Sequence, residues 1–368
     1  MRTIVVSAVN IRKGGTLTIL KDCLSYLSSL TKDGKYRVVA LVHQRSLTDY
    51  PGIEYIEFPD TIKNWGKRLW CEYFTMYRIS QSLSPVYLWL SLHDTTPRVK
   101  AERQVLYCQT SFPFFKWKFR DFFFDYKIVL FALLTRFVYR INIHKNKYLI
   151  VQAEWLRTGF SNMFHLPKEK FIVATPEQSM LLQNTNKRFT QNEYSFLVAS
   201  SPDCHKNFET VCQATTLLEK KVGKNKFKVI LTIKGNENKY ARWLYKNWGH
   251  ISSIDFRGFM KKEDLYTYYA SVNCLIFPSR IETWGLPISE FANYNKPMII
   301  ADLPYAYETA AGSNLTAFFQ IGQTEDLADK MYSLLNNNFN QFHSIRKNSI
   351  SDPCATTWND LFKILLTE

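Results

Sequence analysis

Short apolar runs alternate with amphipathic stretches along most of the chain. Apolar runs bounded by polar residues predict strands, and they lie at 2–9, 37–43, 54–58, 86–90, 148–152, 171–174, 194–199, 227–233, 274–277 and 298–301. The stretches between them predict helices near 17–30, 67–82, 154–164, 208–221, 287–294, 325–336 and 357–366, with another opening at 261. Strands that alternate with helices in this way predict an α/β fold with doubly wound parallel sheets.

The length of the chain suits two domains. At 368 residues, each of two domains can bury its own hydrophobic core. We predict a first domain at residues 1–175 and a second domain at 192–350. A polar stretch rich in Gln, Asn and Thr at 176–191 is expected to link them, and a final helix is expected within 351–368.

Charge and cysteine usage narrow the class of protein. Lys and Arg number 47 against 32 Asp and Glu, and this net charge of +15 calls for an anionic partner: nucleotide phosphates, an anionic membrane face or nucleic acid. No apolar run approaches the roughly 20 residues that span a bilayer, and the N-terminus predicts a strand rather than an export signal. The seven scattered cysteines lack metal-ligand spacing. We therefore expect a cytoplasmic protein with reduced thiols and no metal site.

The most informative stretch runs from Asn273 to Gly312. A buried strand ends at Pro278, a polar loop follows, and Pro287 suits the first turn of a helix. Glu282 lies in the loop, and Glu290 lies about one turn inside the helix. Because ligands bind at the carboxyl ends of parallel strands, we expect a site at this loop–helix junction.

The residue types at this junction predict separate roles. Free backbone N–H groups near Gly285 could hold a diphosphate or sugar hydroxyls, and glycine allows the ligand to approach the backbone closely. The carboxylate of Glu290 suits the paired hydroxyls of a ribose. Glu282 is expected to lie near the transferred group.

The motif Pro278-Ser279, Glu282, Trp284-Gly285-Leu286-Pro287, Glu290 resembles the signature of the retaining group 1 glycosyltransferases (family four), P-S-x-x-E-x-[FW]-G-L-P-x-x-E. The resemblance implies a GT-B fold, with two Rossmann-like domains facing a central cleft and a final helix that crosses back to the first domain. It also implies a nucleotide-diphosphate sugar as donor substrate, with no cofactor and no metal. The donor-binding residues would include Arg280, Trp284, Gly285, Leu286 and Glu290.

Further candidate residues follow from the same resemblance. The family has a Gly-rich loop where Gly14-Gly15 stands, and a lysine where Lys206 opens a helix. Lys206 would contact the donor diphosphate and stabilise the leaving group. An arginine is common five or six residues earlier in the family, but Ser200 and Ser201 stand there. That phosphate contact is either missing or supplied by Arg280, Lys234 or the glycine loop.

One position of the first domain departs from the family. A histidine commonly follows the strand near residue 109, close to the donor sugar, but this chain has Gln109. An amide can donate a hydrogen bond to a sugar hydroxyl but cannot act as a base. His93, at the end of the preceding predicted strand, is the nearest alternative, and we predict a catalytic role for both residues.

Residues 112–147 combine aromatic and basic side chains. Such a mixture suits a surface that contacts the headgroups of an anionic membrane. We expect a core helix at 124–141, which leaves the loop at 112–120 as the membrane-contacting part. Stacking on single-stranded nucleic acid would use similar residues, but no nucleic-acid-binding motif accompanies them, so we expect no nucleic-acid partner.

The resemblance to this family implies a retaining, metal-independent hexosyltransferase. It would move a sugar from a GDP-mannose-type or UDP-sugar donor to a lipid-linked glycan, in biosynthesis of a surface polysaccharide such as lipopolysaccharide O-antigen or capsule. It would be cytoplasmic and peripheral on the inner face of the cell membrane. Two alternatives stay open: a nucleotide-sugar epimerase, and a non-catalytic member of the fold that binds membrane or nucleic acid.

Overall fold

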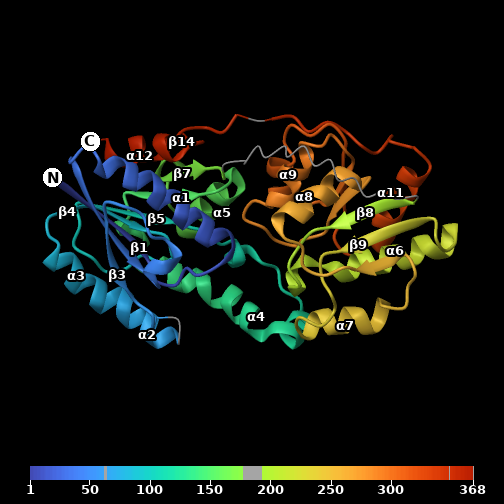
Figure 1. Cartoon of the computed structure of the whole chain (residues 1–368), viewed down its shortest axis with the longest axis horizontal. Coiled ribbons are helices and arrows are strands. Elements are labelled where there is room, and N and C mark those ends of the chain that lie inside the picture. The colour runs from blue at the N-terminus through green and yellow to red at the C-terminus, as the bar shows by residue number, and fades with distance from the viewer. Residues whose placement is uncertain (62–63, 177–192, 348, 368) are drawn as a thin grey trace. The chain divides into compact units, whose positions relative to one another are not determined.

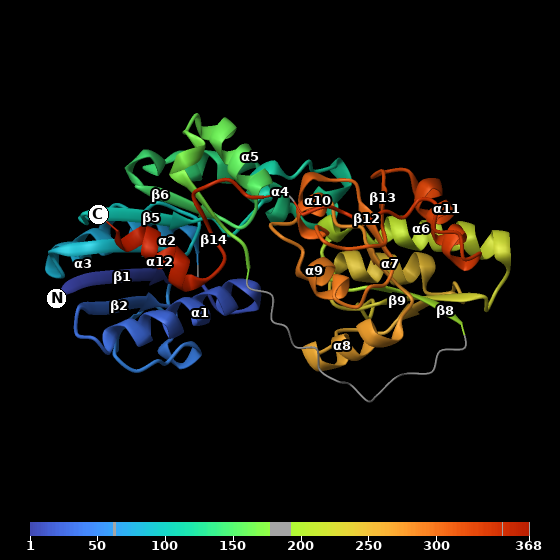
Figure 2. The ribbon, with the colours of Figure 1, turned by 90° about the horizontal axis from the view of Figure 1, so that it is seen from above.

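The computed structural model of the protein describes residues 1–61, 64–176, 193–347 and 349–367. It divides into two compact units (Figure 1): unit 1 contains residues 1–113, 134–177 and 350–368, and unit 2 contains 114–133 and 178–349. Both chain ends lie in unit 1 (Figure 2). Apart from Pro176, the predicted linker at 176–191 lies outside the described residues. Residues 114–133 group with unit 2, whereas we expected the first domain to be continuous.

Unit 1 is built on a parallel sheet with the strand order β14-β7-β6-β5-β4-β1-β2-β3. Its strands are β1 (Arg2–Ala8), β2 (Tyr36–Val42), β3 (Ile53–Glu57), β4 (Val86–Ser91), β5 (Arg103–Tyr107), β6 (Tyr148–Val151), β7 (Phe171–Ala174) and β14 (Cys354–Ala355). Its helices include α1 (Gly14–Thr31), α2 (Trp65–Trp70), α3 (Met76–Ser82), α5 (Glu154–Phe164) and α12 (Trp358–Leu366).

Both faces of this sheet are covered by helices. Alternate residues of β1 point to opposite faces, because the side-chain period of a strand is two. Ile4 and Val6 pack with the buried face of α1 and with α12, and α12 lies beside α1 (Figure 1). Val5 packs on the other face with Cys71 and Met76, from the segment that contains α2 and α3. This arrangement is the predicted doubly wound one.

Unit 2 contains a second parallel sheet with the order β10-β9-β8-β11-β12-β13. Its strands are β8 (Tyr194–Val198), β9 (Phe227–Leu231), β10 (Ile254–Phe256), β11 (Cys274–Phe277), β12 (Met298–Ala301) and β13 (Thr316–Phe319). Its helices are α6 (Phe208–Val222), α7 (Lys239–Trp248), α8 (Lys262–Ser271), α9 (Leu286–Ala292), α10 (Pro304–Thr309) and α11 (Thr324–Leu335). The sequence did not predict α7, α10, β13 or β14.

The two sheets share one topology. In each sheet, the first strand of the unit is flanked by its second and fourth strands, so the order in which strands are added changes side at the first strand. Open parallel sheets bind ligands at this switch point, where the loops after the two central strands diverge. In unit 1 the point lies after β1 and β4, and in unit 2 it lies after β8 and β11.

Helix α4 (Phe119–Arg140) corrects one prediction. It begins before the expected core helix and is interrupted at Asp125, whose φ and ψ are −152° and 88°. One side of it is buried, through Val129, Ala132, Thr135 and Tyr139. The opposite side exposes Tyr126, Leu130, Leu133, Leu134, Phe137 and Ile141. The expectation of a core helix at 124–141 was therefore wrong for one face. The helix carries apolar side chains on both sides, but neighbouring elements cover only one of them.

Candidate functional site

Two loops of unit 2 meet at its switch point. After β8, a short 3-10 turn, η6 (Cys204–Lys206), precedes α6; after β11, the chain continues through Pro278 and Arg280. The backbone N–H of Arg280 donates to the carbonyl of His205 (2.8 Å). The side-chain amide of Asn207 donates to the carbonyl of Pro278 (3.1 Å). These bonds fix the two loops against each other.

The same contact brings Lys206 and Glu282 together. The Nζ of Lys206 donates to Oε1 of Glu282 at 2.5 Å, and each side chain is 14% exposed. The two residues are 76 positions apart in the chain, and the sequence predicted both as site residues. A lysine and a carboxylate at the switch point can contact a ligand that carries both phosphates and a sugar.

Arg280 lies in the same loop as Glu282, but its side chain is held by residues other than Lys206 and Glu282. Its Nη2 donates to Oδ1 of Asp121 (2.7 Å), and its guanidinium carbon lies 4.9 Å from the centre of the Phe115 ring. The residue is only 7% exposed. Its Nε and Nη1 have no hydrogen-bond partner among the described residues. Because buried, unpaired N–H groups cost free energy, a ligand oxygen at these atoms would be stabilised.

The buried histidine next to Lys206 has two positively charged neighbours. Burial, followed by the positive charges of Lys206 and Arg280, lowers the pKa of His205 well below its usual value. His205 is therefore neutral near pH 7. Burial disfavours a charge of either sign, so it is the two cations beside the ring that would favour an anion such as a diphosphate.

Glu290 occupies a separate position, on helix α9. Tyr266 and Tyr269 of α8 donate to its two carboxylate oxygens at 3.2 and 3.3 Å. Burial raises the pKa of Glu290, while Lys262 and the two tyrosine hydroxyls partly offset this effect. Each carboxylate oxygen keeps a lone pair for a further donor, so the clamped carboxylate can still accept from a diol.

The residues before α9 have different exposures. Gly285 has a φ of +91°, and a Cβ there would lie 3.3 Å from Ile288, so the sequence needs glycine at this turn. Leu286 is exposed, whereas Trp284 is buried. The indole N–H of Trp284 donates to the Ser289 hydroxyl (3.3 Å). The buried Trp284 therefore packs beneath the surface of the loop and stabilises it. Its predicted contact with the donor stays a prediction.

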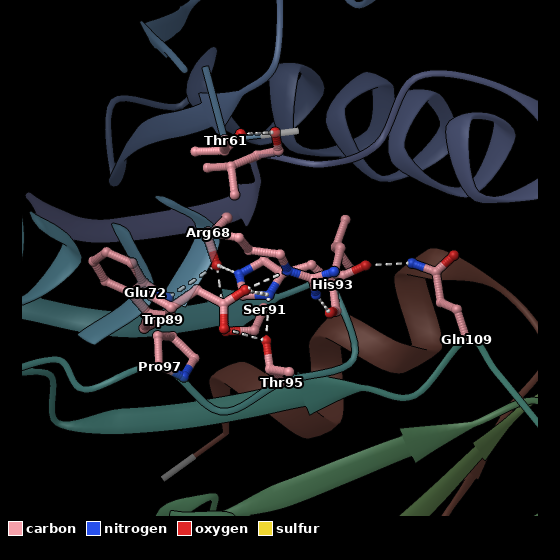
Figure 3. Close-up of polar contacts among 12 residues, drawn as sticks. Thr61, Arg68, Glu72, Trp89, Ser91, His93, Thr95, Pro97 and Gln109 are labelled. Atoms are coloured by element: carbon pink, nitrogen blue, oxygen red, sulfur yellow. Dashed lines mark hydrogen bonds and ion pairs between the residues drawn. The ribbon is translucent and has the colours of Figure 1, made fainter. Parts of the chain in front are cut away.

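The predicted residues of unit 1 lie at its own switch point. Figure 3 shows His93 among buried polar groups. Its Nε2 lies 3.0 Å from the hydroxyl of Ser7, and its Nδ1 lies 2.9 Å from that of Thr95. Thr95 in turn donates to the fully buried Glu72 (2.7 Å). Burial lowers the pKa of His93 to about 4, so the ring is neutral and both nitrogens are engaged.

Gln109 is also nearly buried. Its side-chain amide donates to the carbonyl of Leu92 (2.7 Å), as Figure 3 shows. Its backbone N–H donates to Oδ1 of Asp94 (2.5 Å). Burial raises the pKa of Asp94 to about 6. As placed here, Gln109 and His93 hold the loops that follow β4 and β5, and their predicted catalytic roles stay predictions.

The Gly14-Gly15 turn opens helix α1 after β1. Gly14 has a φ of +70°, and a Cβ added at either glycine would meet no described atom within 4 Å. Both glycines are exposed. The backbone N–H groups at this helix start are therefore exposed, and their predicted contact with an anion stays a prediction.

The site of unit 2 includes residues that sequence reasoning missed. Asp121 lacks any local signal, because its partner Arg280 lies 159 positions away. Tyr266 and Tyr269 are three positions apart, the spacing of one helix face, which was the available signal. Among the described residues, no group of three or more His, Cys, Asp or Glu side chains is placed to hold a metal ion.

Comparisons with known proteins agree with this geometry. Residues 183–352 match the family model described as "Glycosyl transferases group 1", so this part of the chain is similar to that family. No curated protein sequence matches the chain.

Solved structures resemble the whole chain. A glycosyltransferase from Rickettsia africae is 14% identical, with a TM-score of 0.64 over 99% of this chain and 97% of that one. WaaG, a glycosyltransferase involved in lipopolysaccharide biosynthesis, is 14% identical, with a TM-score of 0.64 over 91% and 90%. HepE from Anabaena, solved with UDP-glucose, is 14% identical, with a TM-score of 0.62 over 92% and 90%. At these identities the likeness shows the fold, and the predicted GT-B fold is confirmed.

Proposed function

We propose that the protein is a glycosyltransferase that moves a sugar from a nucleotide-diphosphate donor to an acceptor. The observation that carries this proposal is the Lys206–Glu282 contact at the switch point of unit 2, within the matched domain. Glu290 stands eight positions after Glu282 on the following helix. In this arrangement Lys206 suits the diphosphate of the donor, Glu282 its sugar and Glu290 its ribose.

The charges of the site support departure of a nucleotide diphosphate. Negative charge grows on the diphosphate as the glycosidic bond to the donor breaks. Lys206 stabilises that charge, and the unpaired N–H groups of Arg280 are a second source of donors. Fixed donors that face developing charge are an effective way to lower a reaction barrier. Glu282 would then stabilise positive charge at the anomeric carbon.

The finer aspects of the reaction are part of the same proposal. We propose retention at the anomeric carbon and catalysis without a metal ion, on the basis of the signature around Glu282 and Glu290. The donor would be a UDP-sugar or a GDP-mannose-type sugar. HepE, a protein of the same fold, was solved with UDP-glucose, so UDP is the first nucleotide to test.

We further propose a lipid-linked glycan as acceptor and a peripheral position on a membrane. Among the described residues, no helix is both long and apolar enough to cross a bilayer. The exposed apolar side of α4 carries Lys127, Arg136 and Arg140 beside it. Apolar and cationic side chains on one helix suit the headgroup layer of an anionic membrane.

Calorimetric titration with UDP, GDP and ADP tests the donor site. We expect saturable binding of one nucleotide to the wild type and at least about tenfold weaker binding to Glu290→Ala, because the ribose loses a charged hydrogen-bond partner. Asp329→Ala, a surface carboxylate of the same unit, is the matched control. Absence of binding by all three nucleotides would contradict the proposal and favour a non-catalytic protein.

Product analysis separates the two enzymatic possibilities. A glycosyltransferase releases UDP from UDP-glucose in step with glycan formation and depends on an added acceptor. A nucleotide-sugar epimerase would release UDP without any acceptor. Acceptor-independent release at the full rate would therefore exclude transfer as the main activity.

A further inference from the structure

A second surface of unit 1 combines a cavity with exposed aromatic side chains. Trp65, Trp70 and Phe74 are 50%, 61% and 50% exposed. They lie on α2 and on the π-helical turn η2 (Cys71–Thr75) that follows it. The rings of Trp70 and Phe74 stack, with centroids 4.4 Å apart. Neighbouring exposed aromatic residues commonly mark a binding surface.

The rings of Trp70 and Phe74 border a cavity of about 530 Å³. Its lining consists of Gly66, Leu69, Trp70, Tyr73, Phe74 and Arg98. Small-molecule sites usually measure ≈ 300–1,000 Å³ and have apolar walls with a few polar groups. The walls here are apolar and aromatic, and the guanidinium of Arg98 is the charged group at the edge. The cavity therefore suits a molecule with a hydrocarbon part and one anionic group.

Exposed basic side chains lie on the two segments that line the cavity. Within residues 64–82 and 97–101, the exposed charged side chains are Lys67, Arg78, Arg98 and Lys100. The acid of these stretches, Glu72, is fully buried and paired with Arg68 (2.8 Å). Arg98 forms no ion pair within the part of the chain that the structure describes; its guanidinium lies 4.6 Å from the centre of the Tyr77 ring. A guanidinium without an acidic neighbour can bind a phosphate or carboxylate in a bidentate manner.

The cavity is connected to the switch point of unit 1. The backbone N–H of Arg98 donates to the carbonyl of Glu72 (3.2 Å). The carboxylate of Glu72 points into the unit and accepts from Thr95, which contacts His93 (Figure 3). The cavity wall and the loop after β4 thus share one buried hydrogen-bonded group. A molecule in the cavity lies next to the loops where unit 1 could hold an acceptor.

We propose that this cavity binds the hydrocarbon chain of an anionic amphiphile, with its phosphate or carboxylate on Arg98. The occupant is a single amphiphile molecule rather than a bilayer surface, because the volume of the cavity suits one hydrocarbon chain and Arg98 is the one cation among the described residues of its lining. This inference rests on the proposed function only where it identifies the amphiphile as the lipid part of the acceptor.

Binding of dodecyl phosphate below its micelle concentration tests the inference. Calorimetry on the full chain without nucleotide is expected to show one saturable site. The double variant Trp70→Ser/Phe74→Ser should bind about tenfold or more weakly, because it removes apolar contact area. Arg98→Gln should weaken dodecyl phosphate binding about tenfold or more and leave dodecanol binding unchanged, because only the phosphate needs the cation.

The controls separate this inference from its alternatives. Phe259→Ser removes an exposed aromatic side chain of unit 2 and should bind dodecyl phosphate like the wild type. A lack of saturable binding to the wild type would overturn the inference, even if UDP binds normally and the proposed function stands. Phosphatidylglycerol vesicles that bind through Trp70 and Phe74, without any dodecyl phosphate site, would also overturn it in favour of a bilayer surface.

Discussion

The ion pairs of this protein differ in how far they are exposed to water. Arg37 and Glu54 form a bidentate pair on the surface, where such pairs add little stability. The Lys206–Glu282 pair is largely shielded from water. The charge of each partner is therefore stabilised by the other partner, or by a ligand between the two loops, rather than by water. Shielding strengthens electrostatic interactions, which is why the pair suits a reaction that separates charge.

Variants of the Lys206–Glu282 pair should separate donor binding from turnover. Lys206→Met removes a cation from the diphosphate, so both UDP affinity and turnover should fall, the latter by about 10²–10³-fold. Glu282→Gln keeps the shape but removes a negative charge near the phosphates. We expect its UDP affinity to be unchanged or higher while turnover falls. Calorimetry and UDP-release assays measure the two quantities.

An equal loss of UDP affinity in both variants would contradict these separate roles. Removing one member of a shielded pair leaves the other unpaired, so thermal unfolding of each variant must be compared with the wild type. Lys221→Met is the matched control, because it removes a lysine of the same unit that lies 3.6 Å from Asp329 on the surface.

His93 predicts a pH dependence of stability. Burial lowers its pKa to about 4 in the folded protein, whereas an unfolded histidine titrates near ~6.5. Between these values the unfolded chain binds more protons, so stability falls as the pH is lowered from about 6.5 to about 4. His93→Gln lacks this titration. The stability advantage of the wild type over the variant should therefore shrink towards pH 4, by up to about 3 kcal/mol.

Urea unfolding of the wild type and His93→Gln, at pH values about one unit apart between pH 4.5 and pH 7, measures the difference in their free energies of unfolding. Asp94, whose pKa is raised to about 6, opposes the trend but is present in both proteins and cancels in the comparison. Parallel stability curves would mean that His93 is not held as a buried neutral ring.

At the scale of elements, α4 departs most from an ordinary globular helix. Tyr126, Leu130, Leu133, Leu134 and Phe137 are exposed, and their spacing places them on one side of the helix. A soluble helix usually exposes polar residues there. An apolar side without a covering neighbour among the described residues is the feature that supports the proposed membrane contact.

Vesicle sedimentation tests the apolar side of α4. Leu134→Gln/Phe137→Gln should reduce binding to phosphatidylglycerol vesicles about tenfold or more, because each buried large apolar side chain contributes ≈ 1.5–3 kcal/mol. Binding should also weaken as salt is raised, through screening of Lys127, Arg136 and Arg140. Leu217→Gln, at an exposed apolar position of α6, is the control. Equal binding by all three proteins would exclude α4 as the contact.

At the scale of the whole molecule, the last residues complete the first unit. Helix α12 buries Leu361, Phe362 and Leu365 in the core of unit 1. The ring of Phe362 stacks on Tyr26 of α1 (5.3 Å). The hydroxyl of Tyr87 donates to the carbonyl of Leu366 (2.9 Å). The chain therefore leaves unit 1, forms unit 2 and returns, so that neither unit can be cut out as one continuous segment.

Phe362→Ala should destabilise unit 1 more than unit 2. The fully buried ring leaves a cavity, and such a substitution costs about 3–5 kcal/mol. Hydrogen exchange followed by mass spectrometry should show faster exchange in β1, β2 and β4, while β8, β9 and β11 keep the wild-type rate. Phe259→Ala, an exposed position, is the control. Equal acceleration in both units would show that they unfold together.

The sequence by itself determined the order of most strands and helices and the signature from Pro278 to Glu290. Strand alternation, helical spacing, and turn residues such as Gly285 and Pro287 act over a few neighbouring positions, so they can be read directly from the chain. The doubly wound α/β fold followed from the alternation, and the resemblance of the signature to a known family implied the GT-B fold. Short elements such as α10 and β14 carry too few residues for a periodic pattern, and the sequence did not predict them.

Only the tertiary structure decided which side chains meet and which are buried. The contacts Lys206–Glu282 and Arg280–Asp121 join residues 76 and 159 positions apart, and no local pattern encodes such a pairing. His93 and α4 show that burial cannot be predicted from residue type alone. His93 is polar and buried, whereas one side of α4 is apolar and exposed. Burial depends on which elements pack together, because desolvation is a property of the folded chain and not of the residue type.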